Sequence, residues 1–139
     1  MRKSLHYLLA LVLFGVFFAS YMDLLSHVLY YNEQHQLFLY TADYYHSQTL
    51  TCWLTAFVVQ FFHYPLLGAA VMSALLTAIY LMTWRILTAL TRCEDILRLS
   101  LIPSLALWVW TAGLSHTLSV VVWAFIVLVM LFVPACLLA

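Results

Sequence analysis

The sequence carries very little charge. Of its 139 residues, 7% are Asp, Glu, Lys or Arg, 67% are hydrophobic, and the formal net charge is zero. A soluble domain needs roughly a quarter of its residues charged, and without them it would expose large apolar patches to water. In a lipid bilayer the outer surface can be as apolar as the core. The composition therefore predicts an integral membrane protein, and it offers no clustered basic surface for nucleic acid.

Several chemical signatures are also missing. There is no phosphate-binding loop, dinucleotide fingerprint, nucleophile elbow or haem motif, which excludes the soluble-type enzyme classes that depend on them. The three cysteines, Cys52, Cys93 and Cys136, lack CxxC spacing, so neither a disulfide framework nor a cysteine zinc site is expected. No internal repeat or Gly/Ser linker divides the chain. We therefore interpret residues 1–139 as a single membrane domain.

Long apolar runs predict an all-α integral membrane fold with four transmembrane helices, at about residues 5–21, 66–84, 99–114 and 118–139. The second run would be about 28 Å long at roughly 1.5 Å per residue, which matches the bilayer core. The first run follows Arg2 and Lys3, an arrangement that also fits a secretory signal peptide. We favour an uncleaved anchor, because Phe17 would occupy a cleavage position that requires a small residue.

Pro65 divides the apolar stretch that extends from Trp53 to Leu87. Proline disfavours helix at the residue before it, so residues 49–63 are predicted to form a separate surface or re-entrant helix. Gln60 and His63 lie on one face of that helix, where we expect a structural role at interface depth. After the proline, small residues offer a face for association with another transmembrane helix: Gly68, Ala69, Ala70, Ser73 and Ala74.

The distribution of positive charge predicts the orientation. All five basic residues lie at the amino terminus or between the second and third spans. Cytoplasmic loops collect lysine and arginine. Both termini are therefore predicted to be cytoplasmic, with residues 22–65 forming an external loop and Trp84 marking an interface.

The external loop holds the only concentration of polar side chains. Residues 22–51 contain three acidic residues, three histidines and five tyrosines, but no lysine or arginine. A carboxylate can act as a general base, and tyrosine combines a flat apolar face with a polar tip. The candidate catalytic residues are Glu33 and Asp43. The candidate substrate-binding residues are Asp23, Tyr31, His35 and His46.

The simpler alternative is that this loop caps the membrane interface, where tyrosine is enriched without any catalytic role. The two interpretations stay open on the sequence alone. The histidines show neither HxxxH nor HExxH spacing, so no metal site is expected, and no cofactor is expected either.

Two resemblances extend this picture. The run from Tyr31 to Thr41, YNEQHQLFLYT, resembles the start of an uncharacterised family of large multi-pass membrane proteins from Bacteroidota. In that family a similar segment follows the first span, in chains several times longer. The resemblance implies a bacterial inner (plasma) membrane protein but no established activity.

The layout is also similar to the beginning of the GT-C glycosyltransferases, which use lipid-linked sugars. Those enzymes have a first span, a long external loop with interfacial helices, and a second span. The resemblance implies that an acidic loop residue has a catalytic or metal-binding role, to which Asp23, Glu33 or Asp43 would correspond. It is a likeness of architecture, which argues function poorly.

Two functions follow as hypotheses. The first is a structural or accessory subunit that packs against a partner membrane protein or against copies of itself. The second is the N-terminal portion of a GT-C-like transferase whose external loop contributes to the site. The apolar carboxyl end at residues 133–139 favours a fragment, a split gene product or a subunit with a partner. A transporter is less favoured, because no span carries a central ionisable residue.

Overall fold

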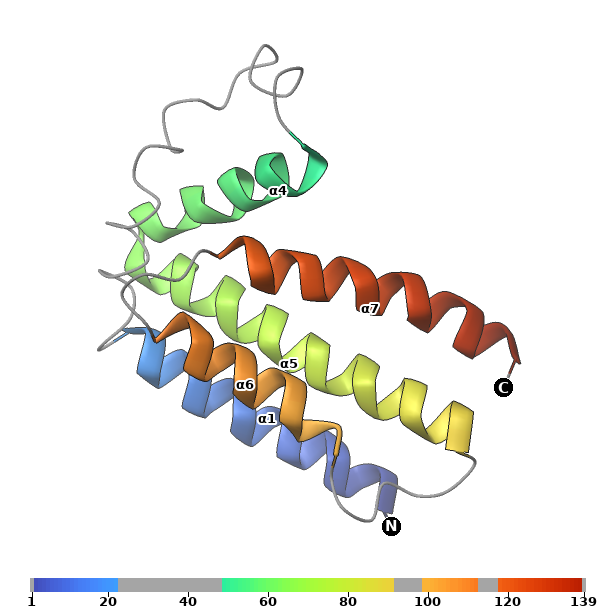
Figure 1. The fold of residues 1–139 in the computed structure, drawn as a ribbon. Helices are drawn as coiled ribbons and strands as arrows, with labels where there is room; N and C mark the ends of the chain where they lie inside the picture. Colours follow the sequence, from blue (N-terminus) through green and yellow to red (C-terminus); the bar gives the residue numbers. More distant parts are fainter. Residues whose placement is uncertain (1, 23–48, 92–98, 113–117, 139) are drawn as a thin grey trace.

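The computed structural model describes residues 2–22, 49–91, 99–112 and 118–138, and every regular element in these ranges is a helix (Figure 1). The first helix, α1, spans Arg2–Ser20. The short helix α4 spans Leu50–Val59 and continues into a 3-10 helix, η3, at Gln60–His63. Three further helices follow, namely α5 at Pro65–Thr91, α6 at Leu101–Thr111 and α7 at Ser119–Leu138. The predicted all-α fold class is confirmed for the described residues.

Helix α5 is the centre of the bundle, and α1, α6 and α7 all pack against it (Figure 1). Helix α4 packs against α7 on the outside of this group. The bundle has two ends, which we name after residues that lie there. The Arg85 end holds the starts of α1 and α6 and the ends of α5 and α7. The Tyr21 end holds the ends of α1 and α6 and the starts of α5 and α7 (Figure 1).

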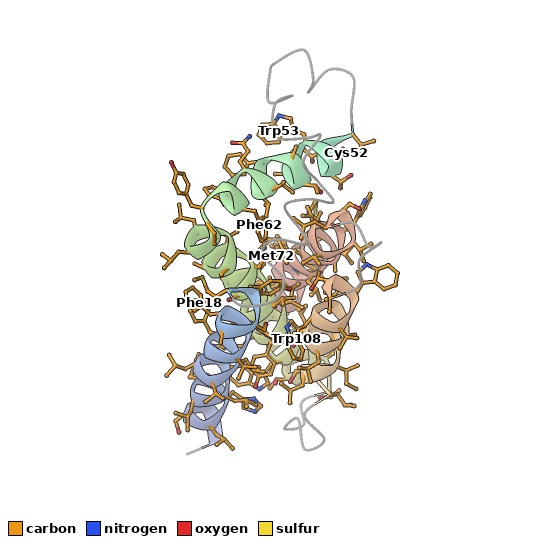
Figure 2. All side chains as sticks on the ribbon, turned by 90° about the vertical axis from the view of Figure 1, so that its left-hand side faces the viewer. Phe18, Cys52, Trp53, Phe62, Met72 and Trp108 are labelled. Carbon is orange, nitrogen blue, oxygen red and sulfur yellow. The ribbon has the colours of Figure 1, made fainter. Side chains whose placement is uncertain are left out.

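The core follows from helical periodicity. Buried residues of α5 recur every three or four positions, at Ala69, Met72, Leu76 and Ile79. The same spacing places Ala10, Leu13 and Phe17 of α1, and Tyr21 just after its end, on one buried face. Residues three and four apart lie on the same side of a helix. Figure 2 shows Met72 near the middle of the bundle, where it is fully buried.

A sharp break separates η3 from α5. Tyr64 is extended, with φ −108° and ψ 107°, as expected for a residue before proline. Pro65 opens α5, a position where its missing N–H costs no helical hydrogen bond. The chain therefore turns at this point, and the separate helix predicted for residues 49–63 is present as α4 and η3.

The last two turns of α5 differ from the sequence prediction. The helix continues through Trp84 and Arg85 to Thr91, so Arg85 is helical and does not belong to the connection between spans. Residues 85–91 include no glycine or proline, and their arginine, leucines and alanine are good helix formers. Trp84 and Ile86 are buried as well, which adds tertiary packing to this extension.

Helix α6 is shorter than the span predicted at residues 99–114. It has 11 residues, which corresponds to about 16 Å at 1.5 Å per residue. A straight crossing of the bilayer core needs about 30 Å. Helix α6 alone does not reach that length.

The small residues predicted to associate with another molecule are used inside the chain. Gly68, Ala69 and Ser73 are buried, while Ala74 is exposed. A Cβ on Gly68 would lie 2.6 Å from Cδ1 and 2.9 Å from Cα of Phe62, so the missing side chain is what allows η3 to approach α5. At Gly68 the close contact is therefore with η3 of the same chain, and association of this face with another molecule stays a prediction.

Candidate functional site

The six residues predicted as catalytic or substrate-binding all lie outside the described residues. They are Asp23, Tyr31, Glu33, His35, Asp43 and His46. Their roles stay predictions of the sequence. The structure does describe the residues that flank this segment: Met22, which lies two residues after the end of α1, and Thr49, which precedes α4.

At the Tyr21 end, two chains of hydrogen bonds join α1 to α6. Trp108 Nε1–H donates to Ser20 Oγ at 2.9 Å, and the Ser20 hydroxyl donates to the Phe17 carbonyl at 2.9 Å. The hydroxyls of Tyr21 and Thr111 lie 2.6 Å apart. Since Thr111 donates its single hydrogen to the Trp108 carbonyl at 2.9 Å, Tyr21 is the donor to Thr111.

These chains satisfy polar groups in an apolar interior. Tyr21 and Thr111 are both buried, and a buried hydroxyl without a partner costs about 1–3 kcal/mol. The rings of Phe17 and Trp108 pack at 5.7 Å in the same place, and Figure 2 shows Trp108 between α1 and α6. The network therefore fixes the end of α1, from which the predicted external loop departs.

No sequence pattern indicated this network. The indole N–H and the ring of Trp108 both contact α1 of the same chain. Trp110 and Trp123 are exposed. A tryptophan alone carries no signal for such a pairing, since its partner Ser20 is 88 residues away.

At the Arg85 end, a second group of polar and aromatic side chains joins α1 to α5. His6 Nδ1 and the Tyr80 hydroxyl share a hydrogen bond of 2.8 Å, and the His6 ring stacks on Trp84 with centroids 4.3 Å apart. Arg85 Nη2 donates to the Tyr7 hydroxyl at 2.8 Å. Its guanidinium carbon lies 5.1 Å from the Trp84 ring centroid. We call His6, Tyr7, Tyr80, Trp84 and Arg85 the Arg85 cluster.

Two buried polar atoms of the described residues have no hydrogen-bond partner: Gln60 Nε2 and Thr77 Oγ1. The Nε2 atom of Gln60 is buried, and the structural role predicted for this residue at interface depth stays a prediction. Nothing is described of the His63 side chain. Within the described ranges no group of three His, Cys, Asp or Glu residues could hold a metal ion.

The described part of the chain is thus a helical bundle with one helix, α5, that is long and apolar enough to cross a membrane by length and composition. Four shorter apolar helices accompany it, at Ser4–Ser20, Leu50–Phe62, Leu101–Thr111 and Ser119–Ala135. This defines the class of protein as all-helical and compatible with a membrane.

The chain belongs to DUF6057, a family of unknown function, whose sequence model matches residues 1–138. No curated protein and no solved structure matches it. The family description adds no activity, so the resemblances to Bacteroidota membrane proteins and to GT-C glycosyltransferases stay predictions of the sequence.

Proposed function

We propose that this chain is an integral membrane protein whose helices α1, α5, α6 and α7 lie in the bilayer, and that it serves as an accessory subunit of a membrane complex. The observation that carries the first part is the apolar outer surface. Large hydrophobic side chains are exposed on each of these helices, including Leu11 (71%), Leu90 (69%), Val109 (66%) and Met130 (71%). In water such a surface would aggregate, whereas lipid is an equally apolar solvent.

The hydrogen bonds of serine and threonine hydroxyls in α5 support the same proposal. Ser73, Thr83 and Thr88 each donate to the carbonyl four residues earlier in α5. Such bonds satisfy a hydroxyl within its own helix. These three hydroxyls therefore need no water to satisfy their donors, which suits serine and threonine placed in a bilayer.

Charge placement supports an orientation with the Arg85 end in the cytoplasm. Arg85 lies at the end of the bundle where α1 begins, and Arg2 and Lys3 are the first basic residues of that helix. Cytoplasmic ends collect positive charge, so the Tyr21 end would face outward from a bacterial inner membrane. The burial of Phe17 and Tyr21 in the bundle core favours α1 as a retained anchor over a cleaved signal peptide.

The outward face of α1 is the best candidate for contact with a partner. Leu8, Leu11, Val12, Gly15 and Ala19 are exposed and lie along one side of the helix. A Cβ added to Gly15 would meet nothing within 4 Å. Small residues four apart let two transmembrane helices approach closely. This pair is open on the surface, in contrast to Gly68.

Gly15→Leu is therefore expected to break the complex and to leave the chain folded. The new side chain fits the isolated molecule but fills the space that a partner helix would occupy. Size measurement in mild detergent should show the wild type in a defined assembly, and the variant as a chain of 16.0 kDa with at least about tenfold weaker association.

Val127→Leu is the matched control, because Val127 is exposed on α7 and gains only one methylene. It should keep the assembly intact. A wild type that is already a monodisperse monomer would contradict the accessory role. The transferase hypothesis depends on Glu33 and Asp43, which lie outside the described residues, so it stays a prediction of the sequence.

A further inference from the structure

We propose that the Arg85 cluster binds the phosphate group of an anionic phospholipid, with the Arg85 guanidinium and the Tyr7 hydroxyl as the donors. This inference rests on the proposed insertion of the bundle into a bilayer. It assigns a ligand to the Arg85 end, for which the sequence suggested only a difference in charge between the two sides of the membrane.

The guanidinium is held in place from two helices. Its Nη2 donates to Tyr7 of α1 at 2.8 Å, and its carbon lies 5.1 Å from the ring centroid of Trp84 of α5. A flexible arginine side chain loses conformational entropy when it binds an anion. If the side chain is already held in one position in the free protein, this entropic cost of binding is smaller. The Arg85 side chain is thus preorganised for binding.

The platform under the guanidinium is itself fixed. Trp84 is buried, His6 stacks on its face with an interplanar angle of 16°, and Tyr7 meets it edge-on with centroids 5.7 Å apart. His6 is tied in turn to the Tyr80 hydroxyl. Two rings of α1 therefore pack on Trp84, and the hydrogen bond with Tyr80 of α5 holds one of them in place.

The cluster has hydrogen-bond donors to spare. A guanidinium has five N–H groups and no acceptor, and one of them is used by Tyr7. The Tyr7 hydroxyl accepts that bond and keeps its own hydrogen. Arg85 and Tyr7 are both exposed, so a phosphate at the surface could accept from both in charge-assisted bonds.

The charge of Arg85 has no carboxylate partner among the described residues, since all five acidic residues of the chain lie outside them. Tryptophan and tyrosine favour the depth of the lipid headgroups. A basic group on an aromatic platform at that depth suits a lipid phosphate.

The test uses the full chain in mild detergent and measures retained lipid by native mass spectrometry. The probes are phosphatidylglycerol and phosphatidylcholine with identical acyl chains. The wild type should prefer phosphatidylglycerol by at least about tenfold, because the choline ammonium of phosphatidylcholine offsets the phosphate charge that strengthens bonds from Arg85 and Tyr7. Arg85→Gln should remove that preference, and Tyr7→Phe should lower it several-fold while keeping the ring that packs on Trp84.

Arg92→Gln is the matched control, because it removes the same charge from the 92–98 segment and should leave the preference within about twofold. An equal loss in Arg92→Gln would overturn the proposal in favour of unspecific attraction. So would an unchanged preference in Tyr7→Phe, which decides the matter even if Arg85→Gln fails to fold. Displacement of the lipid by an equal concentration of inorganic phosphate would indicate a site for free anions. Release of a co-purified acidic protein by Arg85→Gln would indicate a protein partner. Either result overturns the proposal.

Failure of the proposed membrane insertion is seen separately. Release of the chain from membranes at alkaline pH would refute insertion itself, and with it this site. A chain that stays inserted and shows no lipid preference refutes the site alone.

Discussion

Gly68→Leu is expected to destabilise the bundle by about 2 kcal/mol or more, the upper part of the range for overpacked cores. The first atom of the new side chain would fall 2.9 Å from the Phe62 Cα, a backbone atom that cannot rotate away, and 2.6 Å from its Cδ1. The turn at Tyr64 and Pro65 fixes η3 against α5. The two elements must therefore separate to admit leucine.

Thermal unfolding in detergent measures this effect, and Gly15→Leu is the control. Both substitutions gain the same helix propensity relative to glycine, about 1 kcal/mol at most, but only Gly68 faces a neighbour. The Gly68 variant should melt well below the wild type, and the Gly15 variant should not. Equal melting temperatures for the two variants would show that η3 does not pack on α5 as described.

Thr111→Val is expected to cost about 1–3 kcal/mol, because it leaves the buried Tyr21 hydroxyl without an acceptor while keeping the volume of the side chain. Tyr21→Phe removes the other partner. Combined with Thr111→Val it should cost less than the sum of the two single changes, with a coupling of about 1 kcal/mol. Strictly additive losses would contradict the bond between α1 and α6.

Thr83→Val gives the baseline for this comparison. The Thr83 hydroxyl donates only to the Ile79 carbonyl of its own helix, and a carbonyl there keeps its helical hydrogen bond when the hydroxyl is lost. The free energy of unfolding should therefore change little, by about 0.5 kcal/mol or less. A cost equal to that of Thr111→Val would mean that hydroxyl loss is expensive anywhere in the bundle.

The parts of the fold that the sequence predicted depend on local signals. Apolar composition predicted helices throughout, because hydrogen-bonded helices are what an apolar chain can form in lipid. Pro65 predicted the break before α5, because the restriction on the residue before proline is a property of two neighbouring residues. Neither inference needed a knowledge of which helices touch.

The parts that the sequence did not predict depend on pairings between distant residues. Gly68 looked like a contact for another molecule, and its actual neighbour is Phe62, which only the fold of η3 brings back. The bond between Tyr7 and Arg85 joins residues 78 apart. Helical periodicity shows which face of a helix is buried but gives no information on its partner.

The candidate functional residues likewise fall into those that the sequence predicted and those that only the structure shows. Glu33 and Asp43 were selected because carboxylates and tyrosines gather in one loop, which is a property of composition, and they lie outside the described residues. The two clusters that the structure does describe, around Trp108 and around Arg85, involve single tryptophans and arginines that are common at membrane interfaces. Their chemistry becomes visible only when α1 lies beside α5 and α6.

The central claim is that this bundle is embedded in a bilayer, and extraction at alkaline pH tests it most directly. Membranes from cells that produce the chain are washed with sodium carbonate and then with detergent. The exposed apolar side chains of α1, α5, α6 and α7 predict that the protein stays in the membrane pellet through the carbonate wash and leaves only with detergent. Recovery in the carbonate supernatant would contradict the account.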